Sequence, residues 1–135
     1  MSKQTGIALT TLSVDDAGGS PRDIRPQVTN WDLAMPRGVQ DVTGQDATAM
    51  DRLLLLADSS VNLTGAVDAA SNQQHDVFKT VPTTSVARTV TIDAGTPSLG
   101  NEYLFTDYTW TRAQDGSLVW AAPGVLTSGV FNAWA

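Results

Sequence analysis

The sequence contains no cysteine, which excludes disulfides, thiolate nucleophiles and thiolate metal sites. It has a single histidine, His75, so any hydrolytic triad or His-based metal site would depend on that residue. The GxSxG, HExxH, GxxxxGK and GxGxxG motifs of hydrolases, zinc enzymes and nucleotide-binding loops do not occur. We expect His75, beside Asp76 in a predicted helix, to face solvent. The sequence therefore predicts no catalytic residue, no metal and no cofactor.

Charged residues are scarce, at 16% of the chain against about 25% in an average protein. The net charge is −6, with 14 acids against 8 bases, and the only lysines are Lys3 and Lys79. Binding to nucleic acid through phosphates requires clustered bases, so tight binding is disfavoured. An acidic surface would instead let DNA slide past without sticking. The low charge also favours an oligomer, because the centres of interfaces are depleted of charge.

Long apolar runs are missing too. The longest, Leu53–Ala57, is far shorter than the roughly 20 residues of a membrane helix. The first ten residues contain no apolar segment, so we predict neither a secretory signal nor membrane association. The 135 residues show no internal repeat and no linker, which predicts one domain over 1–135.

Apolar residues recur mostly at a spacing of two, which is typical of β-strands. The segment Leu53–Val67 shows this alternation, except in Leu53–Leu56. There the unbroken run favours a strand buried on both faces, with a short helical entry as the alternative. A further strand is predicted over Ser85–Asp93, with Val86 inward. Shorter strands are predicted over Gly6–Val14, Arg22–Ile24 and Gln27–Met35, with a turn at Asp15–Pro21.

The strongest local signal is a hairpin near the end of the sequence. Tyr103–Arg112 and Ser117–Ala122 flank Asp115-Gly116, a dipeptide that suits a tight turn. Trp110 and Trp120 then lie across from each other, and we expect both on the inner face of a two-layer core. A tryptophan platform for sugars, formed with Trp31 and Trp134, is the alternative.

One helix is predicted, over Asn72–Thr80. Ser71 and Gln74 have the spacing of a capping box, and Pro82 ends the helix. The polar segment Pro36–Met50 has no clear period and predicts either a loop or an extended arm that orders against a neighbouring subunit. The residues therefore predict one mainly β domain with one short helix and one long loop or arm.

Four segments together resemble a known family. They are DIRPQVTNWDLAMPRGVQDVTG (Asp23–Gly44), DRLLLLADSSVNLTGAVD (Asp51–Asp68), HDVFKTV (His75–Val81) and NEYLFTDYTWTRAQDGSLVWAAPGVLTSG (Asn101–Gly129). In their order, these segments are similar to the major tail proteins, or tail tube proteins, of long-tailed actinobacterial bacteriophages and related gene-transfer particles.

The resemblance implies a mainly β fold of two packed antiparallel sheets, a β-sandwich or partial barrel, with one short flanking helix. It also implies a structural subunit of the virion tail that assembles in the host cytoplasm. Copies would form hexameric rings, and the rings would stack into a tube for DNA ejection. It implies as partners further copies, other tail proteins at the tube ends, and the tape-measure protein and DNA in the lumen, without tight binding.

The resemblance also suggests candidate contact residues. In the arm, mapped to Pro36–Met50, the inter-ring candidates are Arg37, Asp41, Gln45 and Asp46. The candidates for lumen or ring contacts are the outward-facing strand residues Asn62, Thr64, Thr89 and Thr91. The rival hypotheses are a virion-surface carbohydrate-binding or immunoglobulin-like module, a capsid decoration protein that trimerises, and a hydrolase.

Overall fold

The computed structural model describes residues 5, 7, 9–95 and 97–134. It is mainly β, with two antiparallel sheets and one short helix, as the sequence predicted. The elements are β1 (Thr11–Asp15), β2 (Pro21–Asp23), the 3₁₀ turn η2 (Arg25–Gln27), β3 (Asn30–Ala34), β4 (Arg37–Asp41), β5 (Arg52–Ala57), β6 (Ser60–Ala66), α1 (Gln74–Phe78), β7 (Arg88–Asp93), β8 (Ser98–Phe105), β9 (Thr109–Arg112) and β10 (Leu118–Leu126).

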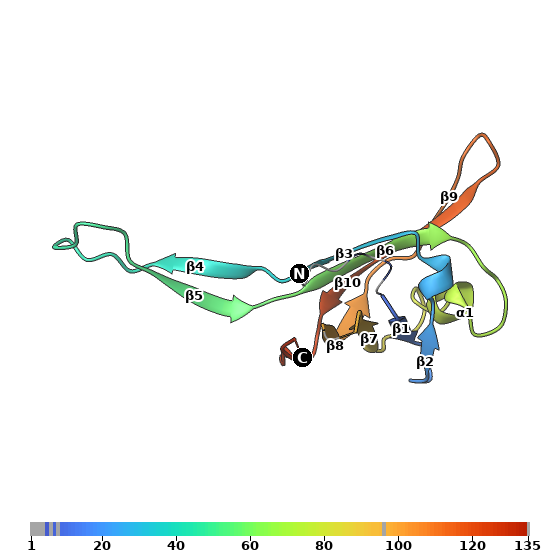
Figure 1. The fold of residues 1–135 in the computed structure, drawn as a ribbon, viewed down its shortest axis with the longest axis horizontal. Helices are drawn as coiled ribbons and strands as arrows, with labels where there is room; N and C mark the ends of the chain where they lie inside the picture. Colours follow the sequence, from blue (N-terminus) through green and yellow to red (C-terminus); the bar gives the residue numbers. More distant parts are fainter. Residues whose placement is uncertain (1–4, 6, 8, 96, 135) are drawn as a thin grey trace.

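The larger sheet has eight strands. Seven follow the order β2-β1-β7-β8-β10-β6-β3, and β9 pairs with β10 beyond the end of β8. The sheet curves around α1. At one side of the sheet, β2, η2 and the loop after β6 lie beside the helix (Figure 1). The second sheet is the hairpin β4-β5, which projects along the direction of β3 and β6, far from the helix (Figure 1).

The core lies between the concave face of the large sheet and α1. Alternation in β6 and β7 buries every second residue, as in Val61 and Leu63, and turns the others outward. The helix adds Val77 and Phe78, both fully buried. Phe78 packs on Trp120 and Phe105, with ring centroids 5.2 and 5.0 Å apart. One copy of the chain thus completes this core by itself.

The turn η2 closes the core beside β6. The indole of Trp120 donates a hydrogen bond from Nε1 to the carbonyl oxygen of Gln27 over 3.2 Å. Gly65, which pairs with Trp120, lies directly under this turn. A Cβ on Gly65 would come within 1.9 Å of the Gln27 carbonyl oxygen, so only glycine fits at this crossing.

Arg88 is a buried charge that ties β7 to the helix. Its guanidinium donates to the carbonyl oxygens of Val77 (2.9 Å) and Asp15 (3.1 Å) and to Oγ1 of Thr80 (2.9 Å). Burial lowers the pKa of this guanidinium, and the acids Asp16 and Asp15 oppose that shift. The sequence analysis had placed no charge in the core.

Several predicted boundaries change. The single strand Leu53–Val67 is divided into β5 and β6. The strand expected from Ser85 begins at Arg88, so Val86 precedes it. The predicted opening strand begins only at Thr11; its residues 6 and 8 lie outside the described residues. The strand predicted over Arg22–Ile24 is β2, which begins and ends one residue earlier, and the strand predicted over Gln27–Met35 is the shorter β3.

The helix is also shorter than predicted. It spans only Gln74–Phe78, with Gln73 as the N-cap and no side-chain capping bond. Asn72 has a φ of 63°, a left-handed conformation that prevents the helix from starting earlier. Ser71 therefore does not serve as the predicted cap.

Candidate assembly surfaces

The convex face of the large sheet carries only acids among its charged residues. Register and alternation place 23 side chains on this face across the strands β1, β2, β3, β6, β7, β8 and β10. Its charged members are Asp15, Asp23, Asp32, Asp93 and Glu102, and no lysine or arginine is among them. The rest are small, apolar or uncharged polar residues, so the face is weakly acidic.

The four strand candidates from the sequence all lie on this acidic face, in two separate pairs. Asn62 and Thr64 lie on β6, whereas Thr89 and Thr91 lie on β7. The two strands are separated by β8 and β10, a distance of about 14 Å at the usual spacing of strands. The structure therefore places them on one surface and not in one cluster.

Hydrogen bonds fix three of these side chains. Nδ2 of Asn62 donates to Oδ1 of Asp32 over 2.9 Å. Oγ1 of Thr64 donates to the Trp120 carbonyl oxygen over 2.7 Å, and Thr89 donates to the carboxylate of Glu102. Two of the five acids on this face, Asp32 and Glu102, are thus held in place by residues of neighbouring strands.

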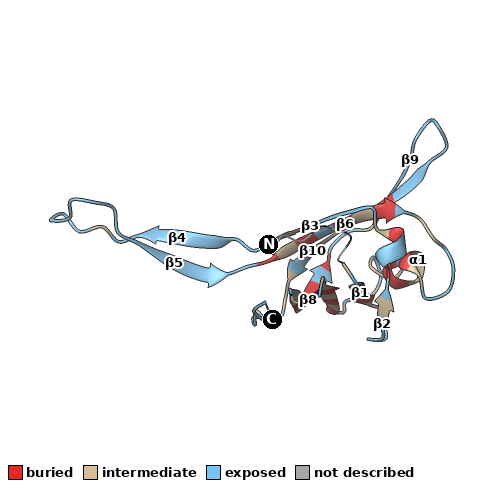
Figure 2. Ribbon diagram, in the orientation of Figure 1, coloured by how far each residue is buried: buried red, intermediate tan, exposed pale blue. Residues whose placement is uncertain are grey.

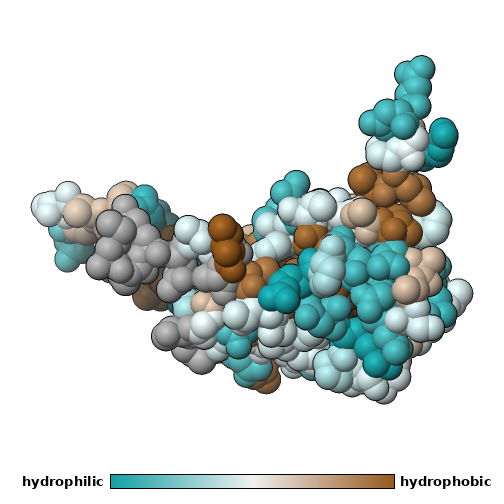
Figure 3. Space-filling view, turned by 45° about the vertical axis from the view of Figure 1, so that its right-hand side comes forward, coloured by the Kyte–Doolittle hydropathy of each residue, from teal (hydrophilic) through white to brown (hydrophobic). Residues whose placement is uncertain are grey.

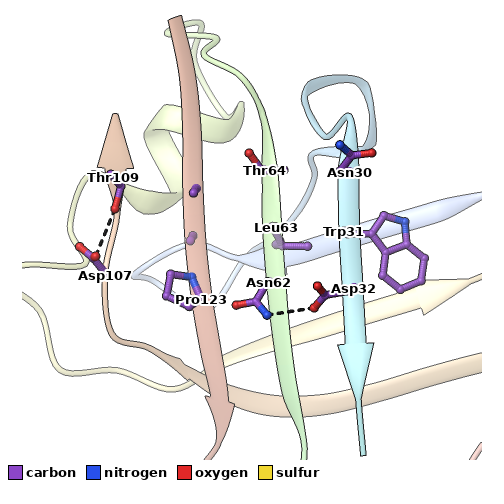
Figure 4. A pocket seen from close by; sticks show the side chains of 11 residues that line it. Asn30, Trp31, Asp32, Asn62, Leu63, Thr64, Asp107, Thr109 and Pro123 are labelled. Carbon is purple, nitrogen blue, oxygen red and sulfur yellow. Dashed lines mark hydrogen bonds between the residues drawn. The ribbon is translucent and has the colours of Figure 1, made fainter. Parts of the chain in front are cut away.

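A shallow groove of about 380 Å³ runs along this face between β3, β6 and β10 (Figure 4). Figure 4 shows Asn62 bonded to Asp32 on one side and Thr109 bonded to Asp107 on the other. The groove has two carboxylates and no base in its lining.

The second surface is the β4-β5 hairpin, called the arm below (residues 36–58). Figure 2 shows both of its strands as exposed, in contrast to the buried centre of the sheet. The predicted burial of Leu53–Leu56 on both faces is wrong for the single chain: these leucines are 54%, 60%, 45% and 91% exposed. The run leaves the domain as β5, and none of the described residues buries it. The strand assignment itself is confirmed.

The arm has internal order despite its exposure. Nε of Arg37 donates to the Leu55 carbonyl oxygen over 2.8 Å, across the hairpin. Near the tip, Asp41 Oδ1 accepts hydrogen bonds from both Oγ1 (2.6 Å) and N (2.9 Å) of Thr43, and these lower the pKa of Asp41. Gln45 and Asp46 lie exposed at the tip. Two of the four predicted arm contacts are therefore engaged within the arm.

A third exposed surface lies at the base of the β9-β10 hairpin. Hydrophobic side chains gather there in Figure 3, where Leu118 and Val119 are 36% and 42% exposed. The hairpin turn has Gly116 at a φ of 94°, as the Asp115-Gly116 signal predicted. Trp110 pairs with Trp120, as expected, but it is 47% exposed, so the prediction that it belongs to the core is wrong.

His75 does not face solvent as predicted, because its half-buried ring packs against β9. Its Nδ1 lies 3.0 Å from the hydroxyl of Tyr108, and its ring centroid lies 5.2 Å from that of Trp110. Gln74 also donates to the Tyr108 hydroxyl, over 2.6 Å. This network anchors the helix to the segment before β9.

Within 9–95 and 97–134, and at 5 and 7, no three histidine or acidic side chains are grouped as metal ligands would be. No helix in the same residues is long and apolar enough to cross a membrane. The tryptophans lie on different elements, with Trp31 on β3, Trp110 on β9 and Trp120 in the core, so these three do not form a common platform.

Solved structures share this fold over almost the whole chain. A chain from the tail of an empty gene transfer agent particle, determined by helical refinement with C6 symmetry, has a TM-score of 0.74 at 15% identity. A chain from the virion of a native gene transfer agent particle has a TM-score of 0.73, also at 15% identity. Each match covers 97% of this chain and 100% of the other. No family model and no curated protein matches the sequence.

Proposed function

We propose that this chain is a structural subunit of a phage-type virion tail. Copies close into hexameric rings, and stacked rings form a tail tube through which DNA leaves the particle. The observation that carries the proposal is the likeness to a chain of a C6-symmetric tail, which extends over all of that chain and 97% of this one. The match includes the projecting arm as well as the sheet domain, because only 3% of the chain lies outside it.

Open strand edges support self-assembly. Among the described residues, β3 pairs only with β6, and β4 and β5 pair only with each other. An unpaired edge presents free N–H and C=O groups to another strand. When one surface of each copy binds a different surface of the next, the copies form a closed ring if the rotation between neighbours divides a full turn evenly. Contacts between stacked rings then extend the assembly into a tube.

The acidic face supports a role as the lining of the lumen. Five carboxylates without a base repel phosphates, so DNA and a tape-measure protein would pass without tight binding. We assign Asn62, Thr64, Thr89 and Thr91 to this lining. The ends of the tube would contact other tail proteins, the location would be the virion tail after assembly in the host cytoplasm, and no enzymatic step is required.

The arm would join one ring to the next. In this assignment Arg37 and Asp41 keep the arm in shape, and Gln45 and Asp46 at its tip reach the neighbouring ring. Because the core is complete without the arm, deleting Gln40–Thr48 should leave a folded domain that no longer forms tubes.

Negative-stain electron microscopy and sedimentation velocity of the purified protein test the proposal. We expect rings with a central hole and stacked tubes for the full chain, and monomers with an unchanged circular dichroism spectrum for the deletion variant. A full chain that stays monomeric at millimolar concentration would refute the tube. Normal tubes from the deletion variant would refute only the role of the arm.

A further inference from the structure

Apolar side chains occupy both faces of the arm. Leu53 and Leu54 are consecutive residues of a regular ladder, paired with Gln40 and Val39, so they point to opposite faces. We call the face of Val39 and Leu54 the first face, and that of Leu53 and Leu55 the second face. Leu55 belongs to the second face because its Cδ1 lies 3.1 Å from the position of a Cβ on Gly38.

The two faces differ in chemistry. The first face ends in a cross-strand pair of opposite charges, Arg52 opposite Asp41. The second face has Gly38 and Gln40 beside its leucines and no charged residue. The first face therefore suits a surface that offers a charged partner, and the second face suits an uncharged surface.

A strand with water on one side alternates apolar and polar residues, whereas a strand buried on both sides has a continuous apolar run. The run Leu53–Leu56 is of the second kind, yet every residue of β4 and β5 is exposed in the single copy. A lone two-stranded hairpin is barely stable in water. Among the described residues, none outside the arm covers it, and other copies of the chain can supply the covering layers.

We propose that the arm inserts between two further copies of this chain, with each face covered by a different copy. This inference rests on the proposed ring assembly. The available area favours the use of both faces: five or six residues in each of two strands give roughly 200 Å² of sheet per face. One face alone therefore supplies about a quarter, and both faces about half, of the roughly 800 Å² per partner of a stable interface. A second copy also suits Arg52, because the chain has 14 acids against 8 bases and so offers carboxylates in excess.

Single substitutions test the two faces separately. Leu53→Thr and Leu54→Thr each remove an apolar side chain from one face while keeping a residue that favours strands. Leu53→Val and Leu54→Val are the matched controls, because they keep an apolar strand former at the same position. Sedimentation velocity at a series of concentrations gives the critical concentration for assembly, and thermal unfolding below that concentration checks the fold.

We expect each threonine variant to raise the critical concentration roughly tenfold or more, and each valine variant to stay within about threefold of wild type. Unfolding should be unchanged in all four variants, because the arm lies outside the core. If one threonine variant assembles like wild type, the arm lies on a single surface and the inference is wrong.

Thiol labelling gives an independent measurement, because the chain has no cysteine of its own. Leu53→Cys and Leu54→Cys should both react with a maleimide in the monomer and both become protected in assembled particles. Protection at only one of the two sites would refute insertion but leave the tube intact. A wild-type chain that never assembles would instead overturn the proposed function, and this inference with it.

Discussion

Replacing Gly65 by alanine should destabilise the domain more than any other glycine-to-alanine change in its strands. The Cβ would lie 1.9 Å from the carbonyl oxygen of Gln27 and 2.9 Å from Cα of Val28. Both are backbone atoms of the turn that closes the core, so no side chain can rotate away to make room. The turn itself must move by more than 1 Å to restore an ordinary contact.

The magnitude follows from what that movement disrupts. Overpacking of a filled core costs about 1–3 kcal/mol. Moving Gln27 also breaks the hydrogen bond from the buried Trp120 indole, which contributes about 1 kcal/mol. Alanine recovers roughly 0.5 kcal/mol through the lower entropy of the unfolded chain. The expected loss is about 3 kcal/mol, a large part of the roughly 5–15 kcal/mol that stabilises a typical domain.

Gly100→Ala is the matched control, because it lies on β8 with only Oγ1 of Thr91 near its Cβ, at 3.7 Å. We expect its stability to stay within about 0.5 kcal/mol of wild type. Urea unfolding followed by tryptophan fluorescence, below the concentration of assembly, measures both variants. A loss below 1 kcal/mol for Gly65→Ala would show that η2 is not held against β6 as described.

Two further predictions concern buried and ionised groups. Arg88→Met removes the guanidinium that donates a hydrogen bond to the Val77 carbonyl oxygen. We expect the free energy of unfolding to fall by about 3 kcal/mol in the same urea assay. Combined with Leu53→Cys or Leu54→Cys, it should leave the maleimide reactivity of the arm unchanged. The pKa of Asp16 is lowered, chiefly by the backbone N–H of Ser20. A lowered pKa stabilises the fold above the unfolded value of about 3.9, and this contribution disappears as the pH falls through the folded pKa. Urea unfolding between pH 6 and 2.5 should show this loss for wild type, and Asp16→Asn should show a flatter profile.

The parts of the fold that the sequence predicts correctly depend on local patterns. Alternation in β6 and β7 identifies strands because each position needs only its neighbours two residues away. The Asp115-Gly116 turn sets the β9-β10 hairpin for the same reason, since the glycine adopts a positive φ. The pairing of Trp110 with Trp120 follows from that turn.

The errors arise where burial depends on distant parts of the chain. Arg88 is buried only because the helix and β1 supply carbonyl oxygens from 11 and 73 residues away. Trp110 is half-exposed because the β9 hairpin extends past the helix, which no local pattern indicates. The spacing of Ser71 and Gln74 predicted a capping box. Asn72 between them has a left-handed conformation, however, which keeps the helix from starting before Gln74.

The leucine run of β5 is an error of a different kind. Its pattern indicates burial on both faces, and within one copy that indication is wrong. An apolar run shows that its side chains need a covering surface, but it does not show which residues supply that surface. The same run is therefore expected in a domain interior and in an interface between copies. The polar segment 36–50 before it, with Asp41, Gln45 and Asp46, predicted either a loop or an extended arm, so the sequence left the two cases open.

The separation between a completed core and an uncovered arm implies an order of events. Trp120, Phe78 and the sheet around them bury one another within a single copy, so the domain can fold without neighbours. In the proposed assembly, the leucines of the arm gain stability only on association, at up to about 2 kcal/mol for each side chain taken fully out of water. Folding would therefore be insensitive to protein concentration, whereas assembly would depend on it steeply. Because the same hairpin is tied by Arg37 and Thr43 before any neighbour arrives, the arm is largely preorganised, and less of that gain is lost to ordering it.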